Sequence, residues 1–341
     1  MSTQEPMNIV FGLMEGHHRS QIMYTGVELG VFDALTDTPR DAGEVASDLK
    51  VDAQALYRLM RALAALELLR EHPARRFSIA PAGRLLRADH PESLGAGVLL
   101  EQGPEHIAAW KHLPDIVREG KPNGFVREFG KTVFEYADAN PHYGKVFNEA
   151  MVTFSSMLTP LSMEALDGYD FSSISHVCDV GGGHGHMLCS FLQKYSHLRG
   201  SVLELPGVIE DKDVLWAKRL NLEDRCEYIG GNMFEQVPAA DAYMMRLVLH
   251  DWNDEECIQL LRTVHRAAKS GSRMFLFELL VPESEDPHDA KVNDIHMMCV
   301  SSGRERTSGE YGELLDRAGW EYAATYPAPG DWFGVVEGRK P

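Results

Sequence analysis

The sequence predicts an α/β fold in which helices cover both faces of a parallel sheet, preceded by a smaller and mostly helical region. The sheet is indicated by a regular alternation, from about residue 175 onward, of short apolar runs with amphipathic segments. Such alternation is typical of strands joined by crossover helices. The predicted strands are 176–180, 201–205, 225–229, 242–246 and 273–278, with helices at 186–196, 207–220 and 254–269 and an antiparallel edge near 320–326 and 332–337.

Length and composition exclude several classes of protein. The chain has 341 residues, which corresponds to two domains at roughly 150 residues each. Its 33 Lys and Arg stand against 51 Asp and Glu, a net charge of −18 that disfavours nucleic acid as a partner. No apolar stretch approaches the roughly 20 residues that cross a bilayer, and the opening residues MSTQEPMN do not resemble a signal peptide.

The cysteines indicate a reducing compartment. They are scattered, odd in number and include no CxxC pair, which disfavours a disulfide framework or a zinc site. We therefore expect reduced thiols in a cytoplasmic protein. The five are Cys178, Cys189, Cys226, Cys257 and Cys299.

The N-terminal region begins with a long apolar helix and continues with a winged-helix layout. Residues 9–35 have helical apolar spacing, and a helix this apolar must cover either its own domain or a second subunit. In 41–90, Asp41 and Asp52 can each cap a short helix, and a hairpin follows. A DNA-binding regulator has the same layout, but the second short helix lacks the dense basic face that recognition of DNA requires.

Residues 91–165 are predicted to be connecting helices. Within them, Phe147, Met151 and Phe154 belong to a stretch rich in methionine and aromatic residues. Such a stripe either belongs to the core or forms an adaptable wall for a flat hydrophobic ligand, because thioethers and rings pack well on planar faces.

A glycine cluster follows the first predicted strand of the sheet. Asp179 lies near the end of that strand, Gly181, Gly183 and Gly185 follow, and a helix begins at once. Glycines let the backbone approach a ligand closely, and a helix N-terminus offers free N–H groups. Glu204, at the end of the second strand, is placed to accept both hydroxyls of a ribose. This pattern predicts a nucleoside-containing cofactor, although by itself it does not separate NAD from S-adenosylmethionine.

The ends of the next two strands carry further candidate residues. Met233 and Phe234 could lie against an adenine ring whose amino group Asn232 would read. His250 follows the fourth strand, and ligands of such sheets gather at the carboxyl ends of the strands. A neutral imidazole there would be a general base near pH 7. The alternative for a single histidine is a hydrogen-bonded structural role.

Four motifs in their order and spacing carry a resemblance to a known family. They are Leu-Pro after Glu204, GNMF at 231–234, LHDW at 249–252 and GRERT at 303–307. Over nearly the whole chain the sequence resembles the plant-type and hydroxyindole-type small-molecule O-methyltransferases. The resemblance implies a winged-helix-like dimerisation domain over 1–100, connecting helices over 101–165 that contribute to the acceptor pocket, and a Rossmann-like methyltransferase domain over 166–341.

The same resemblance assigns roles to residues. His250 would deprotonate the substrate hydroxyl, with Glu278 and Glu305 as the carboxylates that flank and orient it. No metal is expected. The cofactor would be S-adenosylmethionine, held by Asp179, Gly181, Gly183, Gly185, Glu204, Leu205, Asn232, Met233, Phe234, Arg246 and Asp251, and the acceptor would contact Phe147, Met151, Phe154, Met297 and Met298.

Three positions depart from the family pattern. Glu204 stands where Asp is usual, Asn232 replaces a common Asp, and Arg246 replaces a frequent Lys. None of these changes removes a catalytic role, although Asn232 loses a charge that could help to hold the cofactor.

We therefore expect a cytoplasmic, homodimeric enzyme that methylates a hydroxyl of a small aromatic molecule and binds neither nucleic acid nor membrane. The nearest alternative keeps the fold and cofactor but catalyses C-methylation, hydroxylation or cyclisation. An NAD oxidoreductase is disfavoured because His186 stands where the dinucleotide fingerprint needs glycine, and a DNA-binding regulator is disfavoured on charge.

Overall fold

The computed structural model describes residues 4–330 and 332–341 and divides into two compact units. The first unit extends to Ile107 and includes Tyr136–Phe154, and the second comprises Ala108–Glu135 and Ser155–Pro341. Residues 1–3, which open the stretch considered for a signal peptide, lie outside the described part. No helix among the described residues has both the length and the apolarity to cross a membrane.

The first unit contains the predicted winged helix. Asp41 accepts hydrogen bonds from two backbone N–H groups at the start of α2, and Asp52 accepts one at the start of α3, as predicted. The three short strands form an antiparallel sheet in the order β1-β3-β2. The elements are α1 (Gln4–Glu28), β1 (Arg40–Asp41), α2 (Ala42–Leu49), α3 (Ala53–Ala65), β2 (Leu69–His72), β3 (Arg76–Ile79), α4 (Pro81–Arg84) and α5 (Gly95–Glu101).

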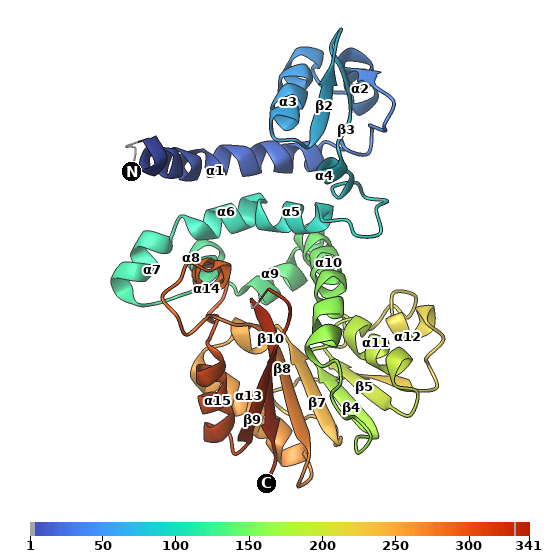
Figure 1. The fold of residues 1–341 in the computed structure, drawn as a ribbon, viewed down its shortest axis with the longest axis vertical. Coiled ribbons are helices and arrows are strands. Elements are labelled where there is room, and N and C mark those ends of the chain that lie inside the picture. Colours follow the sequence, from blue (N-terminus) through green and yellow to red (C-terminus); the bar gives the residue numbers. More distant parts are fainter. Residues whose placement is uncertain (1–3, 331) are drawn as a thin grey trace. The chain divides into compact units, whose positions relative to one another are not determined.

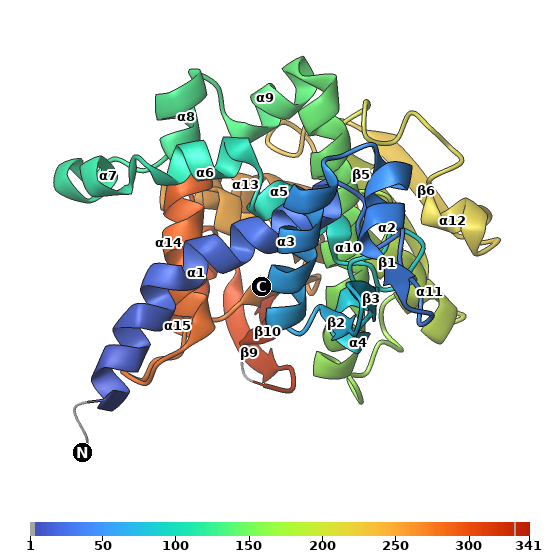
Figure 2. The same cartoon turned by 90° about the horizontal axis from the view of Figure 1, so that it is seen from above.

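Helix α1 is shorter than the predicted 9–35 at its end, because Gly30 adopts a φ of +72° and closes the helix. Its first half extends beyond α2 and α3, as Figure 2 shows. The apolar side chains there are 52–77% exposed; they are Met7, Ile9, Val10, Phe11, Leu13 and Met14. An apolar patch of this kind marks an interaction surface.

The second unit contains the predicted sheet, with seven strands in the order β6-β5-β4-β7-β8-β10-β9 (Figure 1). The first five strands of that order are parallel, and the last two pair antiparallel, as predicted for the edge. The strands are β4 (His176–Val180), β5 (Arg199–Glu204), β6 (Cys226–Gly230), β7 (Ala242–Arg246), β8 (Arg273–Leu279), β9 (Glu321–Pro327) and β10 (Phe333–Arg339).

Helices cover both faces of this sheet (Figure 1). Helices α13 (Asp254–Ala267) and α15 (Ser308–Arg317) pack on one face and α11 (His186–Lys194) on the other. The predicted α/β fold is therefore confirmed. The remaining helices are α6 (Pro104–Trp110), α7 (Leu113–Glu119), α8 (Gly124–Phe129), α9 (Val133–Ala139), α10 (Pro141–Ala165), α12 (Trp216–Arg219), η1 (Leu249–Asp251) and α14 (Asp289–Val300).

The helix predicted over 207–220 is wrong for most of its length. Only Trp216–Arg219 is helical, and turns precede it. The Asp211 carboxylate accepts the backbone N–H of Asp213 at 2.9 Å, a local hydrogen bond that competes with helix formation. Gly207, at the expected helix start, also has a low helix propensity.

Candidate active site

The glycine loop after β4 is built on left-handed backbone. Gly181, Gly183 and Gly185 have φ values of +71°, +56° and +83°, a region that other residues enter only at a cost of about 1–2 kcal/mol. A Cβ on Gly181 would also lie 3.0 Å from Cγ2 of Val248. The sequence prediction of a glycine-dependent loop between strand and helix therefore has a direct conformational basis.

Glu204 connects this loop to the end of β5. Its Oε2 accepts the N–H of Gly183 at 2.9 Å, and its Oε1 accepts the N–H of Leu205 at 2.7 Å. Burial raises the pKa of the Glu204 carboxyl, while these two hydrogen bonds oppose that rise. Each oxygen keeps a second lone pair, so the carboxylate can still accept a pair of ribose hydroxyls.

The buried carboxylate of Asp179 favours a ligand at this loop. Burial raises the pKa of Asp179 to about 7, although Arg246 opposes that rise. Among the described residues its Oδ2 has no hydrogen-bond partner. A buried carboxylate oxygen without a partner is costly. Together with the open glycine loop and Glu204, Asp179 therefore fits the amino and ribose groups of a nucleoside cofactor.

The residues after β6 fit the predicted adenine contacts only in part. Phe234 is half-buried and its ring lies edge-on to Trp252, with centroids 4.8 Å apart. Asn232 is exposed, and its side-chain amide makes local hydrogen bonds within the turn. Its Oδ1 accepts the N–H of Phe234 at 3.0 Å, and its Nδ2 donates to Glu235 Oε1 at 3.1 Å. The amide that we expected to read an adenine is therefore already engaged locally.

Arg246, at the end of β7, belongs to a polar chain that sequence reasoning missed. Its Nη1 donates to Thr159 Oγ1 at 2.7 Å and its Nη2 donates to Ser155 Oγ. Thr159 Oγ1 also lies 3.1 Å from Nδ1 of His186, whose ring packs on Trp216. Burial lowers the pKa of His186, so that imidazole is neutral at pH 7. His186, which stands where the dinucleotide fingerprint needs glycine, is thus a packed, hydrogen-bonded side chain.

His250 lies in the short helix η1 that follows β7. Its Nδ1 is 2.9 Å from Glu305 Oε1, and its Nε2 is 3.9 Å from Asp251 Oδ1. One ring nitrogen of His250 and one carboxylate oxygen each of Glu278 and Glu305 all lie within 4.8 Å of one another. The structure therefore brings together the three residues that the resemblance assigned to catalysis.

The surrounding carboxylates determine the charge of this cluster. Burial opposes the charged imidazole, but Glu305 and Asp251 outweigh it and raise the pKa of His250 to about 10. Burial also raises the pKa of Glu278 to about 8, against the attraction of the imidazolium. At pH 7 the cofactor-free protein therefore holds His250 as an imidazolium. The neutral imidazole expected from sequence is not the form that this environment favours.

Two residues of α14 hold Glu305 in place. Its Oε1 also accepts a hydrogen bond from Asn293 Nδ2 at 2.7 Å, and its backbone N–H donates to Asp294 Oδ1 at 3.0 Å. Glu278 is anchored differently, because its Oε1 accepts the backbone N–H of Leu249 at 3.1 Å. Each flanking carboxylate is therefore fixed by its own donor.

The expected acceptor residues are apolar and lie on two helices. Phe147, Met151 and Phe154 are on α10, where Met151 is exposed and the other two are half-buried. Met297 and Met298 are on α14, buried and half-buried respectively. The first three belong to the first unit and the last two to the second.

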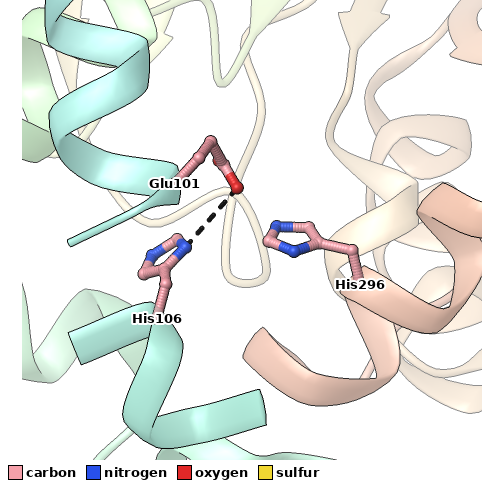
Figure 3. Close-up of side chains that lie close together, drawn as sticks. All are labelled: Glu101, His106 and His296. Carbon is pink, nitrogen blue, oxygen red and sulfur yellow. Dashed lines mark ion pairs between the residues drawn. The ribbon is translucent and has the colours of Figure 1, made fainter. Parts of the chain in front are cut away.

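Another ionisable pair occurs in the first unit, between the end of α5 and α6. Figure 3 shows His106 Nδ1 facing Glu101 Oε2 at 3.6 Å. The Nε2 of His106 lies 3.0 Å from the Tyr143 hydroxyl, and burial raises the pKa of that tyrosine. These contacts join α6 to α5 and α10 within the unit.

Two family models match the chain. Residues 110–321 match the O-methyltransferase domain, and residues 11–89 match the O-methyltransferase dimerisation domain. The fold and the glycine loop define the class, an S-adenosylmethionine-dependent methyltransferase with a Rossmann-like sheet. The chain belongs to the O-methyltransferase family and is an enzyme of that activity. The match of its N-terminal region supports the expected homodimer.

Individual relatives are methyltransferases that match nearly the whole chain. Phenazine O-methyltransferase PhzM of Lysobacter antibioticus is 31% identical over 333 residues, 97% of this chain and 96% of the relative. The 8-amino-8-demethylriboflavin N,N-dimethyltransferase of Streptomyces davaonensis is 31% identical over 324 residues, 93% and 91% of the two chains. The crystal structure of human N-acetylserotonin methyltransferase in complex with S-adenosylmethionine has a TM-score of 0.88 at 25% identity, covering 100% of this chain and 99% of that one.

Proposed function

We propose that this enzyme methylates a hydroxyl group of a small aromatic molecule, with His250 as the general base. The observation that carries the proposal is the 2.9 Å contact between His250 Nδ1 and Glu305 Oε1. Because a carboxylate accepts hydrogen bonds, Nδ1 carries a proton, and Nε2 is the atom that takes the proton of the acceptor. Assistance of this kind contributes about 10²- to 10⁴-fold to a rate.

His250 must lose a proton before it can act as a base, because the free site favours the imidazolium. S-Adenosylmethionine, when bound, supplies an activated methyl group on a positively charged sulfur. Since a second positive charge disfavours an imidazolium, His250 would lose its Nε2 proton in the complex. Glu305 holds the Nδ1 proton throughout, which fixes the tautomer and the orientation of the ring. The raised pKa of His250 in the free protein therefore makes this proton release depend on a bound cation.

The names of the relatives favour a flat acceptor. Phenazine and riboflavin contain fused aromatic rings, and we propose a comparable acceptor here, methylated in the cytoplasm. Its ring system would contact the apolar side chains predicted for it. Replacing them should change substrate choice and leave cofactor binding intact; they are Phe147, Met151, Phe154, Met297 and Met298.

A substrate screen tests the proposal. Phenols, hydroxyphenazines, hydroxyindoles and aminoarenes would be incubated with isotopically labelled S-adenosylmethionine, and products would be located by mass spectrometry and NMR. We expect label on oxygen. The aminoarenes are included because one relative is an N,N-dimethyltransferase. Label only on nitrogen or carbon, or no affinity for S-adenosylhomocysteine, would contradict the proposal.

A further inference from the structure

The catalytic histidine and its carboxylate partner lie on irregular backbone. His250 is in the three-residue helix η1, and Glu305 is in the loop between α14 and α15. Neither segment is a strand or a long helix that would fix its own position. A catalytic contact must nevertheless be held within about 0.5 Å, so other groups must join the two segments.

The guanidinium of Arg306 joins them. Its side chain is 0% exposed. Its Nη1 donates to the carbonyl oxygens of Leu249 and Arg304 at 3.1 and 3.2 Å. Its Nη2 donates to the carbonyl of Trp252 at 2.9 Å and to Asp254 Oδ1 at 2.8 Å, and its Nε donates to the same Oδ1 at 3.1 Å. All five N–H groups of the guanidinium are thus used, and two acceptors bracket His250 in the chain.

The backbone around Arg306 makes close contacts with the other two catalytic segments. Val281, just beyond the strand that carries Glu278, donates its N–H to the carbonyl of Arg306 at 3.0 Å. Gly303 lies directly against η1, where a Cβ would be 1.8 Å from the His250 carbonyl oxygen. Hence the 303–306 segment is in direct contact with η1 and with the chain just beyond the strand that carries Glu278.

We propose that Arg306 is a positioning residue that sets the geometry of the His250–Glu305 pair. It acts through His250, because its donors are all bound to protein acceptors and none remains for a substrate. This inference rests on the proposed role of His250. Nη1 also binds the carbonyl of Arg304, which precedes Glu305, so the side chain that holds η1 also holds the backbone next to Glu305.

The test is Arg306→Lys, which keeps the positive charge but replaces the planar fork by a single ammonium. We expect kcat to fall about 10²-fold, the effect of a displacement of about 1 Å. The Kd for S-adenosylhomocysteine should change less than about tenfold, because the glycine loop shares no partner with Arg306 and only Asp251 of the predicted cofactor residues lies in the segment that Arg306 holds. In the cofactor-free protein, the NMR titration of the His250 ring should move to lower pH, since a looser Glu305 stabilises the imidazolium less.

Arg118→Met is the control. Arg118 lies in α7 of the same unit, is 71% exposed, and pairs with Asp115 at 2.5 Å. This variant should keep kcat and the His250 titration. If Arg306→Lys does not fold, Asp254→Asn is the second test, because it removes the negative charge that Nε and Nη2 of Arg306 share. This variant should lower kcat about fivefold, and the titration of the His250 ring should shift to lower pH as well.

Three results would overturn the inference. One is a folded Arg306→Lys, or a folded Asp254→Asn, with unchanged kcat and titration. Another is an equal loss in Arg118→Met. The third is a loss of S-adenosylhomocysteine affinity as large as the loss of kcat, which would indicate general damage. Full activity of His250→Ala would refute the proposed base, whereas the titration would still report whether Arg306 positions the ring.

Discussion

The glycine loop and the His250 segment follow neighbouring strands, β4 and β7, yet different kinds of interaction hold them in place. The loop depends on backbone: three glycines have positive φ, and the N–H of Gly183 donates to Glu204. The His250 segment depends on buried charge, because Glu305 pairs with the imidazole and Arg306 binds the Leu249 carbonyl. The loop backbone does not titrate, and the raised pKa values of Asp179, about 7, and His250, about 10, place the titrations of the two regions at different pH. Cofactor binding and proton transfer should therefore respond to different perturbations.

The largest expected difference is in pH dependence. Because the carboxylates raise the pKa of His250 to about 10 in the free protein, its neutral form becomes more abundant with rising pH. The value of kcat/KM for the cofactor, which reports the free enzyme, should rise about tenfold per unit between pH 7 and 9. The same rise of kcat/KM should be seen with an acceptor whose own hydroxyl does not titrate between pH 7 and 9.

Binding of S-adenosylhomocysteine should behave differently in the same range. Asp179, with its pKa raised by burial to about 7, has finished titrating by pH 8, so Kd should level off there. A calorimetric titration at pH 8 and 9 compares the two regions directly. A kcat/KM that levels off together with Kd would remove the distinction between them.

The same groups predict the direction of the stability change. His250 and Glu278 both have raised pKa values in the folded protein, so the stability they contribute is complete at low pH and is lost as pH rises. For Glu278 the loss extends from its unfolded pKa to about 8, and for His250 from its unfolded pKa to about 10. Thermal unfolding of the cofactor-free protein should therefore shift to lower temperature between pH 6 and 9.

A smaller effect is expected from Gly181→Ala. The variant forces a φ of +71° on alanine and places its Cβ 3.0 Å from Val248. Holding the loop in its binding shape then costs about 1–2 kcal/mol, and the Kd for S-adenosylhomocysteine should rise about tenfold. The titration of His250 should not change. Gly120→Ala is the matched control, because Gly120 also has a positive φ, +65°, and its Cβ would meet nothing.

The smallest effect is expected from Glu278→Gln. With the pKa of Glu278 raised to about 8, the carboxyl is protonated at pH 7, and glutamine resembles that form. The kcat at pH 7 should change by about twofold or less, while Glu305→Gln, which weakens the partner of Nδ1, should lose far more. Equal losses in the two variants would show that both carboxylates act as charges.

Much of the fold followed from sequence because its signals are local. The five parallel strands, the caps at Asp41 and Asp52 and the loop glycines depend on short-range patterns. The prediction of a helix over 207–220 is wrong, because the apolar spacing there indicates a helix whereas the local hydrogen bond to Asp211 favours a turn.

The site was predictable only in part. The family motifs gave the identities of His250, Glu278 and Glu305, which the structure brings together. The charge of His250 and the five hydrogen bonds of Arg306 depend on residues brought together by folding. The GRERT motif contained Arg306, yet an arginine in a loop gives no sign in sequence that it is fully buried. Thr159 and Asn293 likewise gave no signal.

The most direct test compares wild type with His250→Ala on two hydroxyls of the same ring system, one of ordinary acidity and one made acidic by an electron-withdrawing group. His197→Ala, an exposed histidine of the same unit, serves as control. A base matters only while the acceptor still carries its proton, so the variant should lose about 10²- to 10⁴-fold in kcat on the ordinary hydroxyl and little on the ionised one. Equal losses on both acceptors, or no loss on either, would contradict the assignment of His250 as the base.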